Sequence, residues 1–138
     1  MPSTSPCLLS AAIVVLALAL GACGSGDEDE AKKTVNGVYD ALSEKDAKKV
    51  CDSLSREGRR QITRGGKTRG QSCEKLLALG FRFTGNALKQ AKDAEVSKVK
   101  VDGDKAVATV KLRNRTSNVD LIKENGEWKL NDLQDGGG

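Results

Sequence analysis

The chain has 138 residues, which is enough for one ordinary domain but not comfortably for two. It carries 23 basic and 19 acidic side chains, and setting aside the four acids of residues 27–30 leaves 15 acids against 23 bases, a net charge of +8. There is no histidine, which excludes Ser-His-Asp and Cys-His nucleophile pairs and histidine-ligated metal sites. Aromatic residues are only 3% of the chain, too few for a platform that stacks nucleic acid bases. We therefore expect neither a cofactor nor a nucleic acid partner.

The N-terminal region reads as a targeting segment. Residues 8–20 (LLSAAIVVLALAL) contain one polar side chain, and the run is shorter than the roughly 20 apolar residues of a membrane span. It fits the apolar region of a secretory signal, although the first seven residues lack the usual Lys or Arg. Residues 1–22 are therefore predicted to be a signal peptide.

The end of this segment resembles the lipobox of bacterial lipoproteins, because Leu20, Gly21, Ala22 and Cys23 follow its Leu-small-small-Cys pattern. The resemblance implies that Cys23 receives a diacylglycerol and becomes the first mature residue. It also implies a lipid-anchored protein on the outer face of a bacterial cell membrane, of Gram-positive type. The alternative is an uncleaved helix, or an ordinary signal followed by a chance cysteine.

Two flanking segments are expected to have no regular structure. Residues 24–30 (GSGDEDE) combine two glycines with four like charges, which is typical of an extended, solvated tether between the lipidated Cys23 and the domain. Residues 136–138 are three glycines and are expected to be a disordered tail. The folded domain is thus predicted to span residues 31–135.

Besides Cys23, the mature chain keeps Cys51 and Cys73, 22 residues apart and both on the apolar side of helical patterns. An extracytoplasmic location permits a disulfide, which contributes on the order of 3 kcal/mol. Two unbridged buried thiols are the alternative. A metal site or a redox pair is disfavoured, because there is no histidine and no CxxC spacing.

Helical spacing extends from residue 31 to about residue 80. The first helix has one apolar stripe, formed by Ala31, Val35, Val38, Tyr39 and Leu42. Asp46, Ser55 and Ser72 are the expected N-caps of three further helices, the last of which ends at Gly80. The alternation of Phe81 and Phe83 with Arg82 suggests a short strand or a turn. We leave residues 80–92 unassigned.

From Glu95 the apolar period changes to two. Asp102-Gly103 and Asn125-Gly126 are hairpin turn signals, and a further turn is expected at 114–117. These patterns predict a four-stranded antiparallel meander with one buried face. The fold class is therefore α+β, with N-terminal helices packed on a C-terminal meander.

Three segments resemble the nuclear transport factor 2-like superfamily: residues 34–55 (TVNGVYDALSEKDAKKVCDSLS), the hairpin-linked meander, and residues 126–133 (GEWKLNDL). More narrowly, the chain is similar to small secreted lipoproteins of actinobacterial type, on the evidence of Cys51 and of residues 71–79 (QSCEKLLAL). The resemblance implies a cone-like domain with a curved sheet around a helix, and a Cys51–Cys73 disulfide. It carries little information about function.

Enzymes of that superfamily place Asp, His or Tyr inside the cone. Here Tyr39 lies in a core stripe and no carboxylate stands out on an apolar face. The leading hypothesis is therefore a non-enzymatic binding or interaction module of the cell envelope. Any pocket should lie between the helices and the concave face of the sheet, near Tyr39, Phe81, Phe83 and Trp128.

Two alternatives remain open. One is an isomerase- or dehydratase-like enzyme that uses the same pocket on a small molecule. The other is a structural envelope protein that forms a homodimer through the outer face of the sheet, where Val107 and Ile122 are expected on the outer side of their strands.

Six basic residues lie within fourteen positions and are opposed only by Glu57; they are Arg56, Arg59, Arg60, Arg64, Lys67 and Arg69. Such a stretch fits an anionic partner, which for a lipid-anchored protein is anionic lipid or a wall polymer. The alternative is an ordinary solvated helix face and loop.

Overall fold

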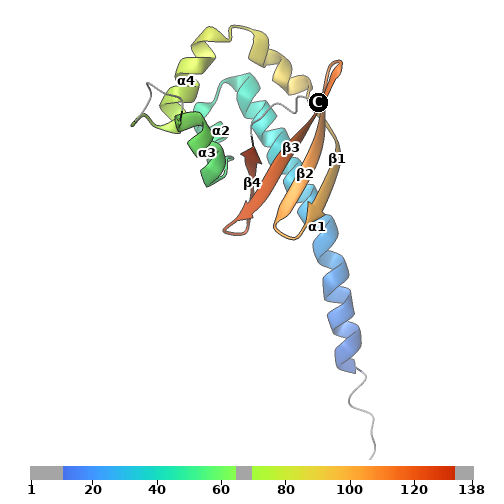
Figure 1. Cartoon of the computed structure of the whole chain (residues 1–138). Coiled ribbons are helices and arrows are strands. Elements are labelled where there is room, and N and C mark those ends of the chain that lie inside the picture. Colours follow the sequence, from blue (N-terminus) through green and yellow to red (C-terminus); the bar gives the residue numbers. More distant parts are fainter. Residues whose placement is uncertain (1–10, 65–69, 133–138) are drawn as a thin grey trace, which may run out of the picture.

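The computed structural model describes residues 11–64 and 70–132, with side chains from residue 26 onward. Helices precede the sheet along the chain, which confirms the predicted α+β class (Figure 1). The elements are α1 (Ala11–Glu44), α2 (Ala47–Asp52), α3 (Arg56–Thr63), α4 (Cys73–Phe83), the 3-10 helix η2 (Ala87–Asp93), β1 (Glu95–Asp102), β2 (Lys105–Leu112), β3 (Arg115–Glu124) and β4 (Glu127–Asp132).

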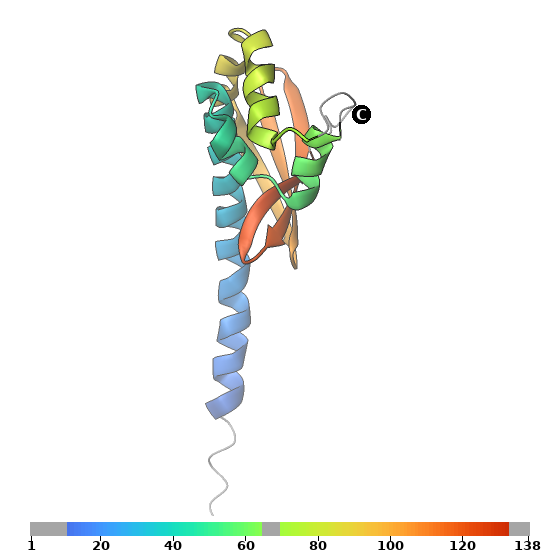
Figure 2. The same ribbon diagram turned by 90° about the vertical axis from the view of Figure 1, so that its left-hand side faces the viewer.

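The sheet is the expected antiparallel meander, in the order β1-β2-β3-β4. Asn125 and Gly126 have φ angles of 53° and 81°, as a tight hairpin turn with right-handed strand twist requires. Because β3 already begins at Arg115, the turn expected at 114–117 is shorter than predicted. Helix α1 crosses one face of the sheet. Helices α2 and α4 lie near the C-terminal end of α1, whereas α3 lies beside β4 (Figures 1 and 2).

All three predicted N-caps are confirmed. Asp46 Oδ1 accepts a hydrogen bond from the N–H of Lys49 at 3.0 Å, and Ser55 Oγ accepts one from Gly58 at 3.0 Å. Ser72 Oγ accepts a hydrogen bond from the N–H of Lys75 at 3.3 Å. These bonds satisfy first-turn N–H groups that have no partner inside the helix.

Between α2 and α3 the chain joins the edge of the sheet. The N–H of Ser55 donates to the carbonyl of Leu130 at 2.8 Å, and the N–H of Leu130 donates to the carbonyl of Ser53 at 2.9 Å. Leu54 forms a parallel bridge with Leu130 and is fully buried. Residues 53–55 therefore cover the outer edge of β4.

The strand or turn expected around Phe81 and Phe83 is wrong, because α4 continues through Gly80 to Phe83. The physical reason is tertiary: Phe81 is 7% exposed and packs with Ala41 of α1 and Val50 of α2. That burial outweighs the cost of about 1 kcal/mol for a glycine inside a helix. The 3-10 helix η2 accounts for most of the second half of the segment 80–92 that the sequence leaves unassigned.

The extended tether expected at residues 24–30 is also wrong, because these residues lie within the unbroken helix α1. One turn further on, Ala31 and Val35 are fully buried against the rest of the domain. The helix is therefore held by packing that local composition does not reveal. The glycine tail at 136–138 lies outside the described residues.

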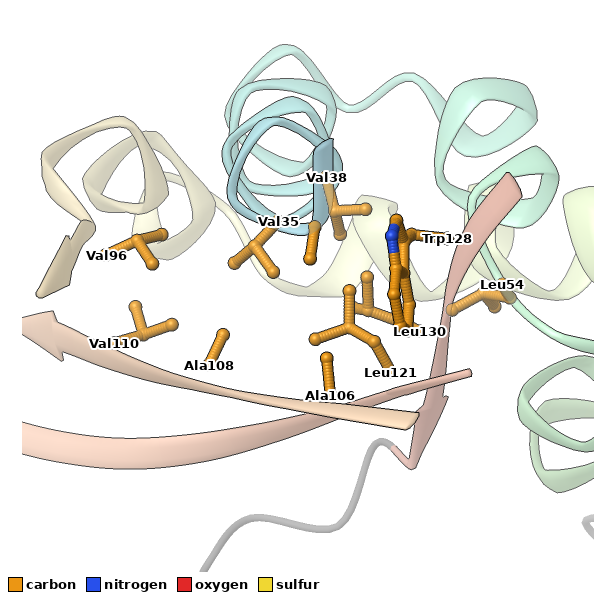
Figure 3. Close-up of a cluster of buried hydrophobic side chains, with 11 residues drawn as sticks. Val35, Val38, Leu54, Val96, Ala106, Ala108, Val110, Leu121, Trp128 and Leu130 are labelled. Carbon is orange, nitrogen blue, oxygen red and sulfur yellow. The ribbon is translucent and has the colours of Figure 1, made fainter. Parts of the chain in front are cut away.

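The main core lies between α1 and the concave face of the sheet (Figure 3). Val35 and Val38 of α1 face Ala108, Val110 and other inward side chains of β2, and the cluster continues through Leu121, Trp128 and Leu130. Short alanines on β2 allow the helix to approach the sheet closely. Fully burying a Val or Leu side chain stabilises a fold by about 1.5–3 kcal/mol.

A disulfide ties the helical part together. Cys51 of α2 and Cys73 of α4 are joined, with their Cα atoms 6.1 Å apart. This is the pairing that the family resemblance implies. Within the described part of the chain, none of the helices has both the length and the apolar character needed to span a bilayer.

Candidate ligand pocket and polar clamp

A small pocket lies where α1, the other helices and the concave face of the sheet meet. Its volume is about 240 Å³. Apolar side chains from all four α-helices form most of the wall, and polar groups come from β3 and β4. The lining residues are Val38, Tyr39, Leu42, Val50, Ile62, Leu77, Ser117, Asn118, Val119, Leu130 and Asp132.

The structure places Tyr39 in this wall, but not the other three residues predicted for a pocket. Phe81 belongs to the second apolar cluster, and Trp128 is 3% exposed within the main core. Phe83 is 84% exposed, because α4 buries the face that carries Phe81 and Phe83 lies on the opposite face. Of the four residues predicted for a pocket, Tyr39 alone lines this one, and Trp128 instead lines a wider groove of about 630 Å³ on the other side of α1.

Sequence reasoning missed the polar groups of the pocket, above all Asp132 and Ser117. Asp132 follows Trp128 and Leu130 at alternate positions, and the same alternation leads from Ser117 to Val119. Extending the inward face of each strand to its end would have found both. Asp132 is half-buried and is the one carboxylate among the pocket residues.

A polar clamp fixes α1 to the other end of the sheet. Lys123 Nζ lies 2.5 Å from Asp27 Oδ1, and the two side chains are only 24% and 25% exposed. The same ammonium group lies 5.4 Å from the centre of the Trp128 ring, within cation–π range. Trp128 Nε1 is buried near Asp27 but forms no hydrogen bond with any of the described residues. The three residues link α1, β3 and β4.

The hydrogen bond from Lys123 lowers the pKa of Asp27, and the hydrogen bond to Asp27 raises the pKa of Lys123. The lowered carboxyl pKa stabilises the fold above the ordinary aspartate value of about 3.9. This contribution disappears as the pH falls through the folded-state pKa. The raised pKa of Lys123 stabilises the fold below the ordinary lysine value of about 10.4. This stabilisation is lost as the pH rises through the folded-state pKa. The clamp is therefore fully formed at neutral pH.

A second, wider groove of about 630 Å³ runs between α1, α2 and the β3–β4 turn. Several of its charged groups already have ionic partners, among them Lys49, Asp52, Glu127 and Lys129. Lys129 Nζ lies 2.7 Å from Glu127 Oε2 and donates to the carbonyl of Asp52 at 2.9 Å. In the described residues, no group of three carboxylates or cysteines could hold a metal ion.

The basic stretch is only partly available to an external anion. Arg60 and Arg64 lie 3.3 and 3.2 Å from the carboxylate of Glu57, and Arg59 Nε donates to the carbonyl of Cys51 at 2.9 Å. Arg56 is exposed at the start of α3. Lys67 and Arg69 lie outside the described residues. An anionic partner for this stretch remains a prediction.

No protein-family model matches this chain, and no curated protein or solved structure is significantly similar to it. The resemblance to nuclear transport factor 2-like proteins therefore remains a prediction.

Proposed function

We propose that this protein is a lipid-anchored, extracytoplasmic binding module of the bacterial cell envelope, which takes a small and mainly apolar ligand into the pocket beside Tyr39. The observation that carries the proposal is the pocket, which lies between the helices and the concave face of the sheet. Few convergent polar groups in an apolar pocket are typical of small-molecule sites.

The size and lining of the pocket limit the ligand. A cavity of 150 Å³ holds benzene, so one of 240 Å³ has room for about ten non-hydrogen atoms. Most of the wall is aliphatic, and the polar lining residues are Tyr39, Ser117, Asn118 and Asp132. A compact, mainly apolar ring or branched chain fits this size and lining.

The anchoring part of the proposal rests on the lipobox pattern that ends at Cys23. Replacing Cys23 with Ala should leave an unprocessed precursor or release the protein from membranes. The check is membrane fractionation combined with the intact mass of the protein. Processed, membrane-bound C23A protein would refute the lipoprotein assignment.

Native mass spectrometry of protein purified from the envelope tests the pocket. A bound small molecule of discrete mass is expected. Val119→Phe places a larger side chain in the pocket and should abolish the adduct. The control Val107→Phe makes the same change on the outer face of the sheet and should retain the adduct. Protein that carries no adduct, or equal adducts on both variants, would contradict a ligand in this pocket.

One observation favours an enzyme as the second candidate. Tyr39 and Asp132 line the same pocket, which brings a residue with a hydroxyl and one with a carboxylate, the group types of acid–base chemistry, to one candidate ligand site. Asp132→Asn should then abolish turnover of the bound molecule while leaving its binding within a few-fold of wild type. A bound ligand that is recovered chemically unchanged from wild-type protein would favour the binding module.

The dimeric structural alternative gains little support. Val107 is 39% exposed on the outer face of the sheet, and Ile122 is half-buried. Lys98, Lys100 and Lys111 are exposed around them. A stable dimer interface needs a larger apolar centre than these two side chains provide.

A further inference from the structure

We infer that residues 24–30 form a rigid stem that holds one end of the sheet directly against the lipid surface. That end, here called the hairpin pole, consists of the β1–β2 turn at 103–104 and the β3–β4 turn at 125–126. The inference rests on the proposed anchoring at Cys23. In this arrangement the domain does not turn freely on its anchor but keeps one face toward the membrane.

The stem is rigid because it is docked at its far end. Helix α1 is continuous through residues 24–30, and Asp27 is held by Lys123, whose ammonium group also lies over the Trp128 ring. The next turn buries Ala31 completely. An unstructured segment of seven residues would instead let the domain turn freely within a reach of about 15 Å.

The clamp also determines which face meets the membrane. Cys23 precedes Asp27 by four residues, or about one helical turn of roughly 6 Å. Lys123 lies at the end of β3, and its N–H donates to the carbonyl of Asp104 in the neighbouring turn at 2.8 Å. Both hairpins are thus tied to the level of the clamp, one turn from the acylated residue. Figures 1 and 2 show both turns at the end of the sheet nearest the N-terminal half of α1.

Charge does not bring this surface to the membrane. The two turns and their flanks carry four acidic residues against Lys105; the acids are Asp102, Asp104, Glu124 and Glu127. Anionic headgroups would repel such a surface. The acyl chains and the stem must therefore do the holding, so the separation should depend on the stem rather than on a basic patch.

Two variants that each add one free cysteine measure the orientation. Asp104→Cys places a fluorophore at the hairpin pole, and Asn114→Cys places one in the exposed β2–β3 turn at the opposite end. The eight residues of β2 separate them by about 25 Å. With the acylated protein in phosphatidylcholine vesicles that carry an acceptor lipid, energy transfer should be several-fold greater from position 104. Equal transfer from both positions would overturn the inference.

A matched pair of stem variants tests the cause. Glu28→Pro removes a backbone hydrogen bond of the stem and clashes with the preceding turn, so the contrast between positions 104 and 114 should collapse. Glu28→Ala removes the same charge without breaking the helix and should keep the contrast. If the proline variant retains the full contrast, the stem is not what orients the domain.

Amide hydrogen exchange separates failure of the stem from failure of the anchor. In a helix that begins at Cys23, the first four N–H groups lack partners, so protection should begin at Asp27 and extend through Glu30. Fast exchange at these four amides in detergent-purified protein would overturn the stem even if Cys23 is acylated. Protected amides in a protein that lacks the acyl mass would refute the anchoring, and with it the orientation, but not the docked helix.

Discussion

The two ends of the domain are stabilised in different ways. Toward the hairpin pole, α1 lies on the sheet over a continuous apolar core, and a polar clamp joins Asp27 to Lys123. At the other end, α1, α2 and α4 share a smaller cluster around Phe81, and a disulfide ties α2 to α4. The first region depends on burial, and the second compensates for a small core with a covalent bond. Variants in each region should separate the two contributions.

The largest effect should come from the main core. Leu121 is 2% exposed in the centre of β3, and Leu121→Ala removes that packing and leaves a cavity. We expect the free energy of unfolding to fall by about 2–5 kcal/mol. Urea denaturation followed by circular dichroism measures it. A loss below about 1 kcal/mol would mean that the sheet side is not the main source of stability.

The disulfide should come next, with a more local effect. Replacing both Cys51 and Cys73 with Ala should lower stability by about 3 kcal/mol, because the unfolded chain regains the freedom of a 22-residue loop. Amide exchange should quicken in α4 while β2 and β3 stay protected. Equal loss of protection in both regions would show that the two ends do not unfold separately.

A glycine at the junction between the two regions gives an intermediate effect. A Cβ atom on Gly58 would lie 2.9 Å from the backbone oxygen of Leu130, whereas one on Gly37 of α1 would meet nothing within 4 Å. Gly58→Ala should therefore cost about 1–3 kcal/mol. The control Gly37→Ala should raise stability by about 0.5–1 kcal/mol. Thermal melts of the two variants should shift in opposite directions.

The smallest effect is expected at Phe83. Its side chain is 84% exposed, so Phe83→Ser should change the free energy of unfolding by no more than about 0.5 kcal/mol. The same change at Phe81 serves as the buried comparison and should be far more costly. Similar melting temperatures for the two variants would contradict the assignment of inward and outward faces to α4.

Local signals were sufficient for much of the fold. The caps at Asp46, Ser55 and Ser72 satisfy their own first turns, and the Asn125-Gly126 turn is set by its own two residues. The helical state of residues 24–30 was not predictable in this way. It depends on a contact between Asp27 and Lys123, which are 96 residues apart.

The same distinction explains the candidate site. Tyr39 was found because it belongs to a helical stripe, and the location of the pocket follows from packing helices on one face of a meander. Asp132 was missed because an acidic residue at the end of a strand is ordinarily solvated. Phe81 and Phe83 were misassigned because two alternating aromatic residues fit a strand and a helix equally well over so short a run.

The covering of β4 by residues 53–55 bears on how copies of this protein meet one another. An open strand edge is a template for pairing between molecules, and the hazard grows when proteins are crowded on a surface. Here one edge of the sheet is occupied by the chain itself. The opposite edge, β1, has an irregular register between Val96 and Lys98 and exposes Lys98 and Lys100. We therefore expect densely packed molecules to stay separate instead of joining their sheets edge to edge.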